Sequence, residues 1–394
     1  MTNAQYMNVR VWISTTFLVG LACLAMVGQT RPRARDVGIE PGLGKPGPAN
    51  AITDVNGVRV GHTTIRSGDN VRTGVTAILP HGGNVFRDKV AGAVFVGNAF
   101  GKLAGSTQVQ ELGTIESPIV LTNTLSVGVA MDAIVRWTMA QAGNENVRSV
   151  NALVGETNDG GLNDIRGLHV TRDHVTAAIV EAKEGPVEEG AVGAGTGTVA
   201  FGWKGGIGTS SRKIPQHDNE WTVGVVVQSN YGGRLTIAGV PVWRELSPPR
   251  VSDPRDPSDP RDPFSPRDPR FADGSCMIVV ATDAPLDARD LERLAARAIF
   301  ALARTGSTYS NGSGDFAIAF STHPSLRVTN ATAPQSRTVM PTESVSGLFE
   351  AVMDATEEAV YNSLLRAVDT SGNGRTVRAL PTDQLRSVLQ KYGR

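Results

Sequence analysis

The chain has 394 residues, which is long enough for a large core arranged as one large domain or as two. Lysine and arginine together number 38, and so do aspartate and glutamate, so no net charge draws the protein to nucleic acid or to anionic lipid. With 44 glycines but only 11 phenylalanines, 5 tyrosines and 5 tryptophans, the composition favours tight turns over aromatic platforms that stack bases. A peptide or small-molecule partner is therefore expected, and nucleic acid is not.

The first 50 residues have the composition of a leader and a spacer. Residues 11–27 are uncharged and mostly apolar and follow Arg10, a pattern that predicts a signal peptide over residues 1–28 and hence a secreted or periplasmic protein. An uncleaved membrane anchor is the alternative, although the run is shorter than the ~20 residues of a spanning helix. Residues 29–50 are rich in proline, glycine and arginine and are predicted to form a flexible tether.

Local patterns predict strands and helices along the rest of the chain. Residues 52–62 alternate around Asn56-Gly57 and predict a hairpin. Strands are predicted at 74–80, 91–97, 150–155, 222–228, 276–282 and 315–322, and helices at 126–142, 288–304, 344–368 and 382–391, with Asp287 as an N-cap. Layers of strands with helices on both sides fit an α/β fold, namely an α-β-β-α sandwich.

A glycine-rich stretch at residues 190–212 interrupts this pattern. Its opening imitates a dinucleotide fingerprint, but no amphipathic helix follows the glycines, so that kind of site is excluded. Two interpretations stay open, because the stretch suits either a series of turns or a pocket lined by backbone.

The junction at Gly274-Ser275 organises the second half of the chain. Residues 247–270 are rich in proline, arginine and aspartate and are predicted to be a linker, and the apolar strand begins directly after the junction. If the Gly274–Ser275 bond is cut, Ser275 becomes a free N-terminus whose α-amine can act as the base for its own hydroxyl. Gly-Ser pairs are also common in turns, so the pair alone does not establish cleavage.

Other polar residues near predicted strand ends could assist such a nucleophile. Ser313 and Asp315 stand two residues apart where a strand begins, so alternation would point both to one face and suit a proton relay. Asn230 ends a strand and its amide can donate to an oxyanion, although a turn asparagine is the simpler interpretation of its surroundings. Cys276 is predicted to pack in the core, because alternation turns it away from Ser275.

Competing chemistries have weaker support. His169 and His174 have a metal-like spacing but lack paired cysteines or a His-Glu-x-x-His helix. A Ser-His-Asp triad built on His323 lacks a Gly-x-Ser-x-Gly elbow. Cys23 and Cys276 are the only cysteines, and the first lies in the leader, so no disulfide framework is expected. No metal or other cofactor is predicted.

Three stretches resemble the DmpA-type family of self-processing aminopeptidases, which includes L-aminopeptidase/D-amidase-esterases and β-peptidyl aminopeptidases. They are DGSCMIVVATD at 273–283, the glycine-rich GAVGAGTG with FGWKGGIGTSSR, and NGSGDFAIAFST at 311–322. The resemblance spans roughly residues 50–370. It implies a four-layer fold of the DmpA and ornithine acetyltransferase type, similar to N-terminal-nucleophile hydrolases.

The resemblance also implies maturation and activity. The chain would cut itself at Gly274-Ser275 into an α-chain, 51–274, and a β-chain, 275–394, which stay together and assemble as a homo-oligomer. The enzyme would release N-terminal residues from peptides, amides or esters through an acyl-enzyme on Ser275, and no cofactor is implied.

Roles for the helper residues come from the same resemblance. Ser313 and Asp315 would assist the nucleophile, and Asn230 would stabilise the oxyanion. Several relatives have glutamate where this chain has Asp315, which leaves the proton-transfer roles open. Some relatives carry a functional tyrosine in the loop that here spans 156–160, and this chain has none there.

Two other functions remain as alternatives. One is an acyltransferase of the ornithine acetyltransferase kind, which uses threonine as nucleophile and works in the cytoplasm, in conflict with the leader. The other is a non-catalytic secreted binding protein in which Gly274-Ser275 is only the end of a linker.

Overall fold

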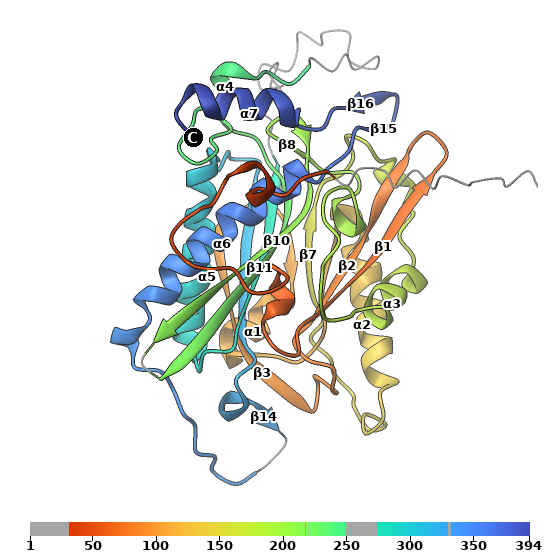
Figure 1. The fold of residues 1–394 in the computed structure, drawn as a ribbon. Helices are drawn as coiled ribbons and strands as arrows, with labels where there is room; N and C mark the ends of the chain where they lie inside the picture. Colours follow the sequence, from red (N-terminus) through yellow and green to blue (C-terminus); the bar gives the residue numbers. More distant parts are fainter. Residues whose placement is uncertain (1–30, 217, 250–273, 330–331) are drawn as a thin grey trace, which may run out of the picture. The chain divides into compact units, whose positions relative to one another are not determined.

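Two β-sheets stacked face to face form the centre of the computed structural model (Figure 1). The structure describes residues 31–216, 218–249, 274–329 and 332–394. One sheet has five strands in the order β1-β2-β6-β7-β4. The other has seven, in the order β10-β11-β12-β13-β3-β14, with β5 paired to β3.

The strands of both sheets have the following bounds. The five-stranded sheet contains β1 (Arg59–Ser67), β2 (Val71–Leu79), β4 (Leu103–Ala104), β6 (Ile119–Asn123) and β7 (Leu153–Thr157). The seven-stranded sheet contains β3 (Asp88–Ala99), β5 (Thr114–Ile115), β10 (Gly206–Gln216), β11 (Asn219–Asn230), β12 (Ser275–Thr282), β13 (Gly314–Ser321) and β14 (Val328–Thr329). Two small pairs are β8 (Val199–Ala200) with β9 (Trp203–Lys204), and β15 (Thr370–Gly372) with β16 (Arg375–Val377).

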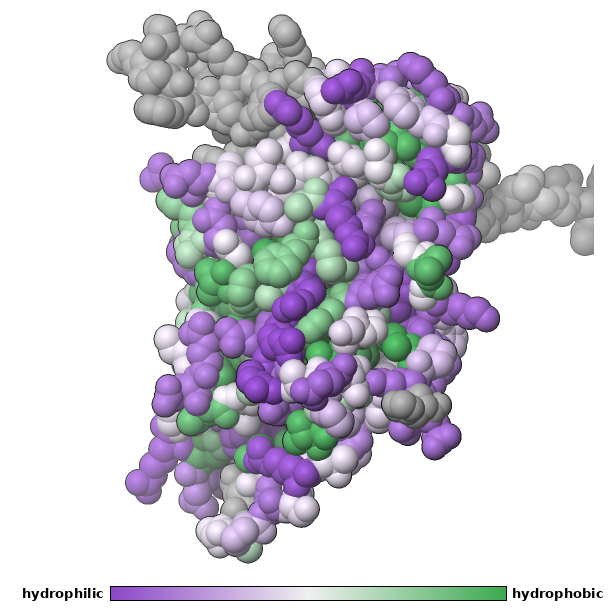
Figure 2. All heavy atoms as spheres, turned by 90° about the vertical axis from the view of Figure 1, so that its left-hand side faces the viewer, coloured by the Kyte–Doolittle hydropathy of each residue, from purple (hydrophilic) through white to green (hydrophobic). Residues whose placement is uncertain are grey.

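Helices cover the outer face of each sheet. Helices α5 (Ala288–Thr305) and α6 (Ser346–Leu365) pack on the seven-stranded sheet, and α2 (Val127–Met139) and α3 (Arg172–Val180) pack on the five-stranded sheet (Figure 1). The shorter helices are α1 (Ser106–Leu112), α4 (Val242–Glu245) and α7 (Thr382–Lys391). The outward side of the α5–α6 layer mixes hydrophilic side chains with apolar patches (Figure 2). This arrangement confirms the predicted α-β-β-α sandwich.

Helix α5 shows why these sequences fold as they do. Its buried side chains, among them Leu291, Leu294, Ala298 and Leu302, recur at intervals of three and four residues, so they form one apolar stripe. The Asp287 carboxylate accepts the backbone N–H of Asp290, one of the free N–H groups of the first turn, as the N-cap prediction required.

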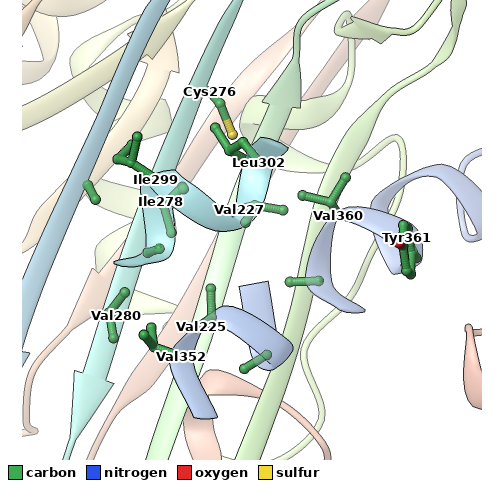
Figure 3. Close-up of a cluster of buried hydrophobic side chains, with 14 of the residues drawn as sticks. Val225, Val227, Cys276, Ile278, Val280, Ile299, Leu302, Val352, Val360 and Tyr361 are labelled. Carbon is green, nitrogen blue, oxygen red and sulfur yellow. The ribbon is translucent and has the colours of Figure 1, made fainter. Parts of the chain in front are cut away.

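Strand β12 is buried on both faces, so it separates two cores. Its Met277 and Val279 face the other sheet, whereas Ile278 and Val280 face α5 and α6 (Figure 3). Cys276 also lies on the helix side, and burial raises the pKa of its thiol well above the usual range. The prediction that this cysteine packs in the core is confirmed.

The hairpin predicted at residues 52–62 is wrong. Ile52–Asp54 forms a 3-10 helix, and β1 begins only at Arg59, where it pairs with β2. The Asp54 carboxylate accepts two nearby backbone N–H groups and so stabilises the helical turn. Asn56-Gly57 does form a turn, but between this helix and β1 rather than between two strands.

The flexible tether predicted at 29–50 is also wrong for its described part, residues 31–50. Ala34 is fully buried in the α5–α6 core, and Arg33 forms an ion pair of 2.7 Å with the buried Glu189. Proline and glycine gave this segment the composition of a spacer, but its arginines form hydrogen bonds and ion pairs with residues far along the chain.

The predicted signal peptide at 1–28 lies outside the described residues, as does most of the predicted linker at 247–270. No helix in the described ranges is long and apolar enough to cross a membrane.

Candidate active site

Ser275 is the first residue of β12 and lies between two neighbouring strands. It pairs with Asn230 of β11 on one side and with Gly314 of β13 on the other. The Gly314 N–H donates to the Ser275 Oγ at 3.3 Å and also to the carbonyl oxygen of Gly274 at 3.1 Å. The predicted nucleophile and the carbonyl of the predicted cleavage site therefore share one donor in the uncut chain.

Close packing explains the glycine before the nucleophile. A Cβ on Gly274 would lie 2.0 Å from the Asn230 carbonyl oxygen and 2.6 Å from the Tyr231 Cα, both of which are backbone atoms. Any side chain would push β11 away from the junction. Glycine is therefore required here by the close approach of two backbones.

Ser313 and Asp315 form the predicted pair on one face of β13. The Ser313 hydroxyl donates to Asp315 Oδ1 at 2.9 Å. Asp315 is the ladder partner of Cys276, which faces the helices. Ala317, the next residue on the same face of β13, also packs in the core beneath α5 and α6. The Asp315 carboxylate therefore lies on the helix side of the sheet. Ser275 stands on the opposite face of β12, so in the uncut chain the pair lies beneath the backbone at the junction.

The Asp315 carboxylate is an unusually placed acid. It is fully buried, and among the described residues its Oδ2 has no hydrogen-bond partner. Burial raises the pKa of Asp315 to about 6, although the hydrogen bonds from the Ser313 hydroxyl and the Cys276 backbone oppose that rise. An uncompensated buried oxygen of this kind can accept a new donor, such as an ammonium group.

Asn230 has its amide fixed by two opposite hydrogen bonds. Its Oδ1 accepts the Val199 N–H at 2.9 Å, and its Nδ2 donates to the Asn158 carbonyl oxygen at 3.0 Å. Because one partner is a donor and the other an acceptor, only one orientation of the amide fits. One Nδ2 hydrogen remains for another acceptor. As Asn230 is the direct partner of Ser275 in an antiparallel ladder, both side chains leave the same face of the sheet.

The glycine-rich stretch builds the wall behind Asn230. Its β8–β9 hairpin encloses Lys204, whose ammonium donates to the carbonyl oxygens of Gly195 (2.9 Å), Thr198 (2.8 Å) and Gly205 (2.7 Å). The three donors of a fully buried lysine are thus satisfied, and burial lowers its pKa well below the usual range. The hairpin positions the Val199 N–H that holds Asn230. The stretch is therefore both a series of turns and a backbone-lined wall.

Glu156 is a carboxylate beside the site that sequence reasoning missed. It accepts the Lys102 N–H at 3.0 Å through Oε1, and its Oε2 accepts the Thr124 hydroxyl. A Cβ on Gly101 would lie 3.2 Å from Glu156 Oε1 and 3.3 Å from the Gly314 Cα, so Gly101 lies between this carboxylate and the start of β13, the strand that pairs with β12 at Ser275. The available signal was an acidic residue directly after the strand at 150–155.

Together the fold and the site define a hydrolase with a serine at the start of a central strand. The chain belongs to peptidase family S58, whose family profile matches residues 50–377. The β-peptidyl aminopeptidase BapA of Sphingosinicella microcystinivorans is 41% identical over 392 residues, covering 96% of each chain. The BapA of Sphingosinicella xenopeptidilytica is 40% identical over 420 residues, 99% of this chain and 98% of that one.

Solved structures give the same result. The L-aminopeptidase D-Ala-esterase/amidase of Ochrobactrum anthropi, described as a variant of the Ntn hydrolase fold, superposes with a TM-score of 0.82 at 36% identity, covering 92% of this chain and 99% of that one. A β-aminopeptidase of a Burkholderia species gives 0.80 at 40% identity, with the same coverage. These comparisons confirm the predicted family and fold, and they identify the chain as an aminopeptidase of the N-terminal-nucleophile type rather than an acyltransferase or a binding protein.

Proposed function

We propose that this aminopeptidase matures by cutting its own Gly274–Ser275 bond and that Ser275 then becomes the catalytic nucleophile. The observation that carries the proposal is the shared Gly314 N–H, which holds the Ser275 Oγ and the Gly274 carbonyl oxygen at 3.3 and 3.1 Å. A hydroxyl held beside the carbonyl that it must attack gains much of the rate advantage of an intramolecular reaction. The longer product would be the α-chain, 51–274 with any preceding residues, and the shorter the β-chain, 275–394.

Turnover follows from the groups around the new terminus. The free α-amine takes the proton of the Ser275 hydroxyl as the oxygen attacks the substrate carbonyl, and it returns that proton to the departing amine. The remaining Nδ2 hydrogen of Asn230 donates to the oxyanion, and Ser313 and Asp315 stabilise the ammonium form of the terminus. Water then hydrolyses the acyl-enzyme and releases the N-terminal residue.

Recognition of a free N-terminus needs a negative charge near the nucleophile. Glu156 meets this requirement, because it lies one glycine away from β13 and is held by the Lys102 N–H and the Thr124 hydroxyl. The Lys102 ammonium is 3.6 Å from the same carboxylate and is half exposed, so it can move aside when a substrate ammonium arrives. We assign Glu156 as the anchor for the substrate amine.

The substrate class that has most support is a peptide with an N-terminal β-amino residue. Two relatives named as β-peptidyl aminopeptidases share 40% and 41% of their residues with this chain over nearly its full length. A series of p-nitroanilides tests this assignment, with β-homoalanine, L-alanine and D-alanine derivatives compared under identical conditions. We expect the highest kcat/KM for the β-homoalanine derivative. A higher value for L-alanine would instead place the enzyme with the L-aminopeptidases.

Localisation and assembly complete the proposal. The apolar leader supports export to the periplasm or beyond with removal of residues 1 to about 28, and the family resemblance supports a homo-oligomer of paired α- and β-chains. Mass spectrometry of protein from cell fractions, and light scattering on the purified enzyme, measure these two properties. An intact Met1 in a membrane fraction would indicate an anchor, and a mass of one αβ pair would exclude the oligomer.

A further inference from the structure

The hydrogen bond at the cleavage site is a three-centre bond, which is more than strand pairing requires. A parallel ladder would use the Gly314 N–H for the Gly274 carbonyl alone. Here the same N–H also reaches the Ser275 Oγ. A donor shared by a nucleophile and the carbonyl oxygen beside it stabilises negative charge on either oxygen.

The Asn230 amide does not make this contact in the uncut chain. Its Oδ1 is bonded to Val199 and its Nδ2 to Asn158, and within the described residues no hydrogen bond joins it to the Gly274 carbonyl. The donor already in place at the carbonyl that must be cut is therefore a backbone group of β13.

We propose that self-cleavage and substrate turnover use different oxyanion donors: the Gly314 N–H serves self-cleavage, and the Asn230 amide serves turnover. This inference rests on the proposed function, because it concerns the two reactions of the same serine. In self-cleavage the oxyanion would be stabilised by a backbone N–H, and in substrate turnover by a side-chain amide.

Self-cleavage needs no reagent other than water, because every bond and proton is accounted for within the chain. The Ser275 Oγ forms a bond to the Gly274 carbonyl carbon, and the carbonyl electrons move to its oxygen, where the Gly314 N–H stabilises the charge. The Gly274–Ser275 C–N bond then breaks, and the proton that left Oγ goes to the nitrogen. This gives an ester and a free amine. Water hydrolyses the ester to a Gly274 carboxylate and restores the Ser275 hydroxyl.

Packing holds the Gly314 N–H in its position before the reaction starts. A Cβ on Gly314 would lie 2.8 Å from the Phe100 carbonyl oxygen and 3.1 Å from the Gly101 Cα. The Phe100 N–H also donates to the Ser313 carbonyl oxygen at 3.1 Å. Residues 100–101 thus pack closely against the start of β13 and limit its movement. A donor fixed in this way needs little reorganisation when charge develops.

The test measures the two reactions separately in one variant. Wild type, Asn230→Ala and Ser275→Ala are made by cell-free synthesis, and cleavage at Gly274 is followed over time by intact-mass spectrometry. The kcat of the fully cut protein is then measured with a p-nitroanilide. We expect Asn230→Ala to cut itself within about threefold of the wild-type rate, while its kcat falls by ~10²–10³. Equal losses in both reactions would overturn the inference, because they would show one shared oxyanion donor.

A second arm removes the backbone donor itself. Replacing Gly314 by glycolic acid through nonsense suppression turns its N–H into an ester oxygen and adds no side chain. Self-cleavage should slow by ~10²–10³, the effect of losing one oxyanion donor. Replacing Phe316 by phenyllactic acid removes an N–H on the same side of the same strand, two residues farther on, and should leave the rate close to wild type. Equal slowing by both esters would contradict the proposal.

The proposal and the function it rests on fail in different ways. A wild-type chain that never cuts at Gly274, or a Ser275→Ala chain that still does, would refute self-processing by Ser275. A wild type that cuts normally while Asn230→Ala stays uncut would refute only the division of labour.

Discussion

At the level of single residues, the site contains a buried carboxylate, Asp315, whose ionisation is made unfavourable by its burial. The Asp315 Oδ1 accepts the Ser313 hydroxyl, whereas its Oδ2 has no hydrogen-bond partner in the part of the chain that the structure describes, and burial raises the pKa of Asp315 to about 6. The proposed cleavage would create an ammonium group at Ser275, one residue before Cys276, the ladder partner of Asp315. The uncut chain would then carry an electrostatic cost that the mature enzyme relieves.

The cost in the uncut chain should appear as a pH dependence of stability. An aspartate with a folded pKa of about 6 holds its proton between pH 4 and 6, while the unfolded chain, with a pKa near 3.8, has already lost it. The folded state then binds more protons, so rising pH destabilises it across this window. In a Ser275→Ala parent, Asp315→Asn removes this pH dependence. The free energy of unfolding of the variant minus that of the parent should therefore be larger at pH 7 than at pH 4, by up to about 3 kcal/mol.

Urea unfolding at pH 4 and at pH 7 measures this difference. The comparison is between variant and parent, so the buried acids Asp159 and Glu189, whose pKa values are also raised, cancel. A difference in the free energy of unfolding that stays constant between the two pH values would show that Asp315 is not a strained acid in the uncut chain.

Glu156 gives a second prediction at this scale. If it binds the substrate ammonium, Glu156→Gln should raise KM and lower kcat/KM by about 10- to 100-fold, the worth of a charge-assisted hydrogen bond. Self-cleavage should continue, because no free amine is recognised in that step. Steady-state kinetics with an amino-acid p-nitroanilide give the value. An N-acetylated substrate is the control, since it lacks the ammonium and should distinguish little between wild type and variant. An unchanged KM would assign Glu156 to structure alone.

At the level of elements, local signals predicted what each segment is but not where it sits. Helix α5 with its Asp287 cap, and the apolar runs that became β12 and β13, were visible because helix and strand periodicities are local. The order of strands in the sheets was not visible in this way. Neither was the proximity of Glu156 to Gly314, since it depends on how β7 of one sheet packs against the other sheet. The hairpin prediction failed because residues 52–54 form a helical turn, which hydrogen bonds to Asp54 and Thr209 stabilise.

The glycine-rich hairpin illustrates an element whose role depends on one buried charge. The Lys204 ammonium binds carbonyl oxygens that precede and follow Val199 in the sequence. The Val199 N–H in turn donates to Asn230 and orients its amide. Lys204→Met should therefore lower kcat by ~10–10², with a smaller change in KM, because the amide is needed mainly in the transition state. Lys204→Gln keeps two donors and should lose less.

A double-mutant cycle separates positioning from a general loss of stability. In an Asn230→Ala background, Lys204→Met should reduce kcat little further, since the group that it positions is already absent. Losses that multiply would mean that the lysine does not act through Asn230.

At the level of the whole molecule, the segment at residues 31–50 joins the two chains that cleavage would create. The Arg31 Nε donates to the Leu365 carbonyl oxygen at 2.8 Å, and Arg35 pairs at 3.1 Å with Glu358, both on or beside α6 of the later chain. Composition could not reveal this, because each acceptor lies more than 300 positions away in the sequence. The segment would therefore hold the proposed α-chain and β-chain together after cleavage.

Truncation tests this role. A chain that starts at residue 38 loses Arg31, Arg33, Arg35 and the buried Ala34, and should be less stable by about 3 kcal/mol, the usual minimum for breaking a buried ion pair. A chain that starts at residue 30 is the control and should match the full mature protein. The urea unfolding midpoints of the two chains are compared after self-cleavage. Equal midpoints would mean that the segment does not stabilise the fold and is only a tether.

The central claim is that Ser275 cuts the chain and then catalyses from the new terminus. N-terminal sequencing of the shorter chain in freshly purified, active enzyme tests it most directly, with intact mass to define the other end. The account predicts a chain that begins at Ser275 and ends at Arg394. A start at Cys276 or within residues 250–273, or full activity from a single uncut chain, would contradict it.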